Sequence, residues 1–153
     1  MSNRHEAVYQ KFEVRPQLLE RGKQSTRLVR NNHLTLDVHV VSDGGEDSLH
    51  RHPGSDAVWY VLSGEASFYG EGDKLIAKLH KNEGLHIAHD SPYWFESSGQ
   101  DNLVIMRFGA RIDAELDKTK VHMVERNYVL KTNADGSTQQ HDTKVLEGAF
   151  FGD

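Results

Sequence analysis

Short apolar segments separated by turn residues recur along most of this chain, and this pattern constrains the fold more than any other feature of the sequence. Between residues 33 and 41, Leu34, Leu36, Val38 and Val40 alternate with mostly polar residues, a period of two typical of a half-buried strand. Further short apolar segments follow roughly every 8–12 residues, with glycines and small polar residues between them. The spacing predicts an all-β sandwich or barrel.

Helical signals are few. After residue 41 the expected strands or strand-to-turn segments are 57–64, 65–73, 74–79, 84–90 and 101–109. Residues 15–22 (RPQLLERG) and 113–120 (DAELDKTK) are each expected to form a short helical turn. In the tail, Asn-Ala-Asp-Gly separates two strand-like runs within residues 127–146, which predicts a hairpin or an arm that packs on a second subunit.

The composition bounds the function classes. A length of 153 residues predicts one domain over 1–153. The formal net charge of -5 argues against a nucleic-acid partner, since phosphate binding needs a basic patch. No apolar run approaches about 18 residues, and the first residues lack the apolar core of a secretory signal, so we expect neither a membrane span nor export. The chain has no cysteine, which excludes thiol chemistry and fits a cytoplasmic protein.

The segment LHRHPGSDAVWYVLSGEASF places His50 and His52 one residue apart. Residues i and i+2 of a strand project to the same face, so both imidazoles can aim at one point. Neutral imidazoles suit divalent ions such as Fe, Zn, Mn or Ni. A catalytic metal usually has three protein ligands, however, so the alternative is a pair of strand histidines without a metal.

The residues around this pair resemble the first motif of the cupin family. The motif runs glycine, five residues, His-x-His, three or four residues, glutamate, six residues and glycine. Gly44, His50, His52 and Gly64 match it, but the glutamate position holds Ala57. The segment NEGLHIAHDSPYWF lies where the second motif is expected.

The resemblance implies an all-β, cupin-like jelly-roll barrel with its core at about residues 34–108 and a pocket inside it. It also implies a homodimer, in which the N-terminal and C-terminal arms can pack on the partner. Aligning the second motif puts Tyr93 where the family has its last histidine ligand. A phenolate can bind iron, so Tyr93 is a candidate third ligand beside His50 and His52. It is equally a candidate acid/base group or hydrogen-bond donor to a substrate.

Three more residues are candidates for binding a small-molecule substrate. Trp59 shares the parity of position 57 and lines the pocket if that parity faces inward; the alternative is a core tryptophan. Arg107 lies in an apolar strand and needs an acidic partner or an anionic ligand. His86, like His39, faces the pocket only if the parity opposite to the leucines faces the barrel interior.

Three functions are compatible with these residues. The first is a cupin-type enzyme with a divalent metal on His50 and His52, of dioxygenase, isomerase, lyase or cyclase class. The second is a metal-free isomerase or epimerase in which His50 or His52 takes a proton and Tyr93 gives one. The third is a cupin that binds a small ligand without turnover.

Overall fold

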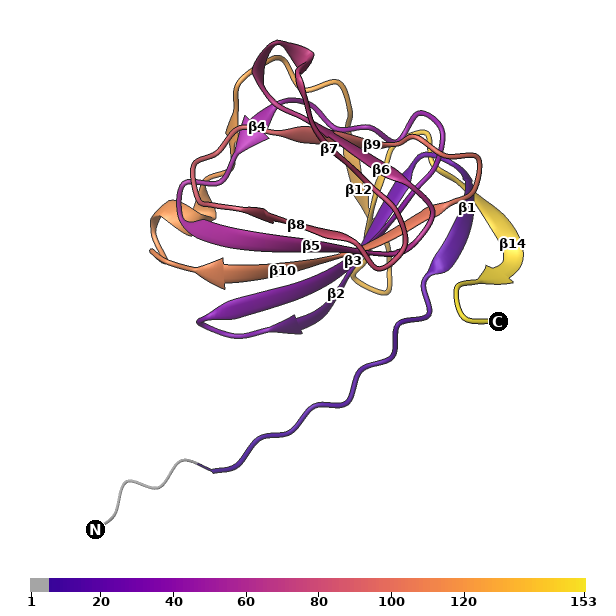
Figure 1. Ribbon diagram of the computed structural model, residues 1–153. Coiled ribbons are helices and arrows are strands. Elements are labelled where there is room, and N and C mark those ends of the chain that lie inside the picture. Colours follow the sequence, from indigo (N-terminus) through magenta and orange to yellow (C-terminus); the bar gives the residue numbers. More distant parts are fainter. Residues whose placement is uncertain (1–5) are drawn as a thin grey trace.

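Strands make up about half of the chain in the computed structural model, which describes residues 6–153. Figure 1 shows them wrapped into a barrel. The strands are β1 (Gln17–Arg21), β2 (Lys23–Arg30), β3 (Leu34–Val41), β4 (His50–Arg51), β5 (Ser55–Ser63), β6 (Ala66–Tyr69), β7 (Leu75–Leu79), β8 (Gly84–Ile87), β9 (Trp94–Ser97), β10 (Leu103–Arg111), β11 (Val121–His122), β12 (Leu130–Thr132), β13 (Thr138–Gln140) and β14 (Lys144–Phe150). Two short 3₁₀ turns cover Glu71–Asp73 and Leu116–Lys118.

Two facing layers form the barrel. The main sheet has seven strands in the order β12-β13-β2-β3-β10-β5-β8. Opposite it lie the three-stranded sheet β7-β6-β9 and the pair β11-β4 (Figure 1). All strand pairings among the described residues are antiparallel. This arrangement is the expected all-β jelly roll.

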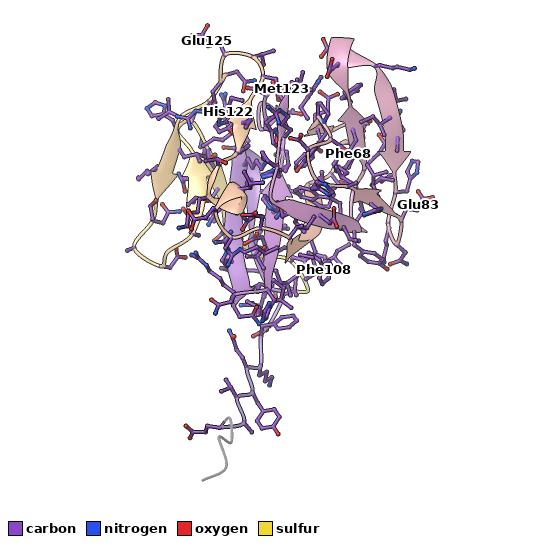
Figure 2. The ribbon with its side chains drawn as sticks, turned by 90° about the vertical axis from the view of Figure 1, so that its left-hand side faces the viewer. Phe68, Glu83, Phe108, His122, Met123 and Glu125 are labelled. Carbon is purple, nitrogen blue, oxygen red and sulfur yellow. The ribbon has the colours of Figure 1, made fainter. Side chains whose placement is uncertain are left out.

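The main sheet is covered on both faces. Its inner face and the three-stranded sheet share an apolar core rich in aromatic residues, which includes Trp59, Phe68 and Phe95. Its outer face packs beneath Leu19 of β1 and neighbouring residues of the chain ends. Figure 2 labels Phe68, which is fully buried in the inner core, and Phe108, which lies outside both core clusters and is 44% exposed.

In strand β3 the two sets of alternating residues face different layers, because the main sheet is covered on both faces. Its apolar residues Leu36, Val38 and Val40 belong to the outer cluster. Its polar residues Asp37 and His39 line the cavity inside the barrel. The apolar parity therefore faces the outer layer, and the polar parity supplies the interior of the barrel.

The backbone angles of two glycines in the first motif explain why glycine stands at these positions. Gly44 has φ +76° and Gly64 has φ +85°, in the left-handed region that other residues rarely adopt. A Cβ atom on Gly64 would also lie 2.5 Å from the main-chain oxygen of Asn102. The motif thus fixes the turns before β4 and after β5, on either side of the histidine pair.

The expected elements compare closely with the observed ones. The strand segments beginning at 33, 57, 65, 74, 84 and 101 are confirmed, and so are the tail hairpin and a helical turn within 113–120. The helical turn expected within 15–22 is wrong: these residues form β1, because Leu19 is buried there and β1 pairs with β14. Asn102 holds this strand with hydrogen bonds of 2.9 Å to both the main-chain N–H and the main-chain carbonyl of Leu19.

Strand β1 and the C-terminal strands pack on the barrel of their own chain, whereas residues 6–13 are exposed and extend away from it (Figure 1). The tail hairpin β12-β13 adds to the main sheet beside β2, so this sheet extends beyond the expected core of 34–108. Within the described residues, no helix is long and apolar enough to cross a membrane. The homodimer stays a prediction.

Candidate functional site

A small cavity of about 170 Å³ lies inside the barrel, between the main sheet and the segments that carry β4 and β9. Larger hollows, of up to about 560 Å³, lie elsewhere and do not contain the histidine pair. We refer to this cavity as the lumen. Its lining combines aromatic, imidazole and charged side chains: Lys23, Arg27, Asp37, His39, Asp47, His50, His52, Trp59, Tyr93, Phe95, Arg107 and Lys120.

His50 is the most constrained member of the histidine pair. It lies on β4 and is 2% exposed. Its Nδ1 atom lies 2.7 Å from the carbonyl oxygen of Ser48. Because a carbonyl can only accept a hydrogen bond, Nδ1 carries the hydrogen and Nε2 keeps a free lone pair. The contact therefore fixes both the tautomer and the orientation of the ring.

Tyr93 is held directly beside His50. The main chains of the two residues exchange hydrogen bonds, of 3.1 Å from His50 N to Tyr93 O and 2.9 Å from Tyr93 N to His50 O. Their ring centroids are 4.5 Å apart, and that of His52 is 5.0 Å from His50 and 6.1 Å from Tyr93. The structure thus brings together the three residues that the sequence singled out as catalytic and metal-binding candidates.

Burial keeps all three rings uncharged at neutral pH. It lowers the pKa of His50 to about 3, and the positive charge of Lys120 adds to this effect. It lowers the pKa of His52 to about 2, with a further contribution from Arg107. The same desolvation raises the pKa of Tyr93 to about 12, which Arg107 offsets only in part. The imidazoles can therefore accept a proton, and the phenol can donate one.

Four charged residues of the lumen form two ion pairs. The Arg27 Nε atom donates to Asp37 Oδ1 at 2.9 Å. The Lys23 Nζ atom lies 3.8 Å from Asp47 Oδ2. Asp47 also accepts a 2.9 Å hydrogen bond from the main-chain N–H of Phe95, which ties the pair to β9.

Sequence reasoning did not select Lys23, Asp47 or Lys120. Asp47 lies in a glycine-rich polar segment typical of a solvated turn, and Lys120 lies in a charged segment after a 3₁₀ turn. No local pattern marks them as interior residues. Asp47 and Lys120 reach the lumen from the turn before β4 and from the residue before β11, whereas Lys23 begins β2 of the main sheet. In Figure 2, His122, Met123 and Glu125 label the segment that follows Lys120.

Trp59 and Arg107 both line the lumen, and Trp59 also belongs to the inner apolar core, so both readings of this residue hold. The two residues are partners in the register of β5 and β10 and therefore project from the same face of the main sheet. The Arg107 guanidinium carbon is 6.0 Å from the Trp59 ring centroid. Of the two other histidines considered, His39 also lines the lumen, and its ring centroid is 5.1 Å from that of Trp59.

His86 lies outside the lumen. It is exposed on β8, where it pairs in register with the exposed Val58. On this strand Leu85 and Ile87 pack against the inner core, so the opposite parity faces outward. The structure therefore does not bring His86 together with the other candidate residues.

The lumen offers a divalent metal no clear group of histidine and carboxylate ligands within the described residues. Ala57, at the motif's glutamate position, offers no ligand, and the side chain of Asp56 is 41% exposed and accepts a hydrogen bond from the main-chain N–H of His89. Throughout residues 6–153, no group of three or more histidine and carboxylate side chains is placed to hold a metal ion. The lumen instead gathers lysine and arginine side chains, whose charge opposes a bound cation.

Comparisons with known proteins agree with this architecture. A family model for the cupin domain matches residues 37–108. A search of the curated proteins found no match.

Three of the similar solved structures illustrate the fold. KdgF from Halomonas sp. is 23% identical with a TM-score of 0.51, and the match covers 61% of this chain and 84% of that one. An uncharacterized protein with a double-stranded β-helix domain from Klebsiella pneumoniae is 21% identical with a TM-score of 0.56, over 66% and 85% of the two chains. An RmlC-like cupin protein from Desulfovibrio desulfuricans is 20% identical with a TM-score of 0.53, over 72% and 94%.

At these identities the structures support the fold alone. The family model adds a match to the sequence itself. Its range includes the histidine pair, Tyr93 and position 57, where alanine stands in place of the motif's glutamate. Over residues 37–108 this chain therefore matches the cupin domain, which supports its assignment to the cupin superfamily.

Proposed function

We propose that the lumen is a metal-independent acid–base site that isomerises or epimerises a small carbonyl compound. The observation that carries this proposal is the arrangement of two rings. His50 presents a free Nε2 lone pair, fixed by the Ser48 carbonyl, beside the protonated phenol of Tyr93. A base and an acid held beside each other in one cavity are what proton transfer to and from a substrate requires.

The proton moves in two balanced steps. First, a C–H bond next to the substrate carbonyl breaks, the proton passes to Nε2 of His50, and the electron pair moves into the carbonyl. The Tyr93 hydroxyl donates a hydrogen bond, or its proton, to the oxygen that becomes negative. Return of a proton to a different carbon, or to the opposite face of the same carbon, yields the isomer and restores both side chains.

The positive surroundings set a condition on the substrate. A pKa of about 3 makes His50 a weak base in the free protein, because burial and Lys120 both oppose its protonated form. A ligand that carries negative charge into the lumen would offset this effect and strengthen the base.

Solvent deuterium exchange tests the proposal. In heavy water with excess chelator, we expect the protein to place deuterium next to the carbonyl of a small keto or hydroxy acid as fast as without chelator. His50→Gln and Tyr93→Phe are each expected to slow the exchange about a hundredfold or more, since general acid–base groups contribute that much. Tyr60→Phe is a matched control, because the Tyr60 hydroxyl bonds to Asn82 at the surface.

Other outcomes would support the alternatives. A divalent metal on His50 and His52 stays a prediction from the sequence. Exchange that chelator abolishes, and that an added metal restores, would favour that enzyme over the acid–base site. A bound ligand that is recovered unchanged and without deuterium would favour a cupin that binds without turnover.

A further inference from the structure

The charges that line the lumen do not balance. Four of its side chains are cations and two are carboxylates. The pairs Arg27–Asp37 and Lys23–Asp47 account for two of the cations. Among the residues that the structure describes, Arg107 and Lys120 form no ion pair. Lys120 is exposed, but Arg107 is partly buried, and a buried cation normally has a counter-charge, so the lumen lacks a negative charge beside Arg107, one that the described chain does not supply.

Arg107 lies where a ligand can reach it. Its side chain projects from the centre of β10 into the lumen, and its one hydrogen bond is a long contact of 3.4 Å from an Nη atom to the Ser55 hydroxyl. Lys120 directly precedes β11, is exposed, and donates to the Tyr128 hydroxyl at 3.0 Å. Both cations therefore border the space that His50 and Tyr93 also line.

Three buried nitrogen atoms of the lumen have no hydrogen-bond partner in the described part of the chain: Arg107 Nε, Trp59 Nε1 and His39 Nε2. The first two are obligate donors. The third carries a hydrogen when the Ser25 hydroxyl, at 2.7 Å, donates to Nδ1. Buried donors are rarely left unpaired, so their convergence on one cavity indicates a ligand with acceptor oxygens.

We infer that the ligand of the lumen is a small carboxylate, with its carboxylate held by Arg107 and Trp59 and its second oxygen-bearing group facing Lys120. A guanidinium matches a carboxylate in shape and charge, and the indole N–H adds a neutral donor beside it. A cavity of about 170 Å³ corresponds to roughly five or six liquid water volumes, which suits a few carbon atoms and excludes a nucleotide. The inference rests on the proposed function because both place the ligand in the lumen. It does not require that the ligand be converted.

The two tryptophans of the chain allow a direct test by NMR. Trp59 lines the lumen and its buried Nε1 has no hydrogen-bond partner, whereas Trp94 Nε1 donates to Asp73 at 2.9 Å and serves as an internal control. Titration with pyruvate, malonate or succinate is expected to shift the Trp59 indole signal and leave that of Trp94 in place. Succinamide, the neutral match of succinate, is expected to bind at least tenfold more weakly, because hydrogen bonds to charged groups are the stronger ones.

Substitutions identify the recognising charge. Arg107→Gln is expected to weaken carboxylate binding between tenfold and a hundredfold, whereas Arg30→Gln, an exposed residue of β2, should leave it unchanged. An unaltered Trp94 signal and thermal midpoint would show that Arg107→Gln folds. Lys120→Gln is a second test, expected to weaken the dicarboxylates more than pyruvate.

The outcomes separate this inference from the proposed function. A Trp59 signal that no carboxylate moves, or that inorganic phosphate moves at lower concentration than any carboxylate, would overturn the inference. Carboxylate binding that depends on Arg107 but brings no deuterium exchange would support the inference and contradict the proposed function. Deuterium exchange on a neutral carbonyl compound, at a rate that Arg107→Gln does not change, would support the proposed function and contradict the inference.

Discussion

Lowering the pH from 6.5 to 4.5 is expected to reduce the free energy of unfolding by about 5 kcal/mol through His50 and His52 alone. Their pKa values, about 3 and about 2 in the folded protein, lie far below the 6.5 of an unfolded chain. As the pH falls below 6.5, the unfolded chain takes up protons that the folded protein does not. Each imidazole then removes about 1.4 kcal/mol of stability per pH unit.

The direction follows from the lowered pKa values. The stabilisation is fully present above pH 6.5 and is lost progressively as the pH falls towards about 3. His39, whose pKa is also lowered well below 6.5 by burial, adds to the loss. Because typical domains have about 5–15 kcal/mol of stability, acid unfolding is expected well above pH 3.

Urea unfolding at a series of pH values measures this effect. The double substitution His50→Gln with His52→Gln is expected to flatten the slope of stability against pH between 6.5 and 4.5. His86→Gln, which removes an exposed histidine from the outer face of β8, should leave the slope as in the parent protein. A parent protein whose stability is constant across this range would show that the imidazoles are solvated and not enclosed.

Replacing Trp59 is expected to have an effect of similar size on stability. Its side chain projects from the main sheet, is 2% exposed and contacts two rings of the three-stranded sheet opposite, with centroids 4.8 Å from Phe95 and 5.7 Å from Phe68. Trp59→Ala would leave a cavity at this junction and should destabilise the protein by about 3–5 kcal/mol. Chemical denaturation of both forms provides the comparison.

Trp59→Phe separates the packing role of the indole from its donor role. Phenylalanine keeps most of the ring volume, so the loss of stability should be well below that of Trp59→Ala. It removes the unpaired Nε1–H, so carboxylate binding should weaken all the same. Equal stability of the alanine and parent proteins would mean that Trp59 does not join the two layers.

Most of the fold could be predicted from the strand pattern and the first motif. The alternation of β3, the apolar run of β5 and the two motif glycines depend on local geometry, which a sequence displays directly. The pairing of β1 with β14 does not depend on local geometry, because it joins residues about 130 positions apart. Residues 15–22 have no strand pattern of their own, and a buried Leu19 together with the Asn102 contacts determines their structure.

The candidate site was predictable only in part, for a similar reason. His50, His52 and Tyr93 follow from motif spacing, Trp59 follows from parity within its strand, and Arg107 follows from its charge within an apolar strand. Which parity faces the lumen depends on what covers the outer face, and this differs between strands: β3 sends its polar residues inward, whereas β8 sends His86 outward. Lys120 and Asp47 reach the lumen from loops, where periodicity gives no direction.

The central claim is that the lumen holds neutral imidazoles, with His50 Nε2 free to accept a proton. Nitrogen-15 NMR of the histidine rings, at pH 7 and pH 5 in chelator-treated protein, tests it most directly. We predict that His50 is protonated only at Nδ1 at both pH values and that one equivalent of zinc leaves its Nε2 signal in place. Protonation of both ring nitrogens at pH 5, or a zinc-induced change at Nε2, would contradict this account.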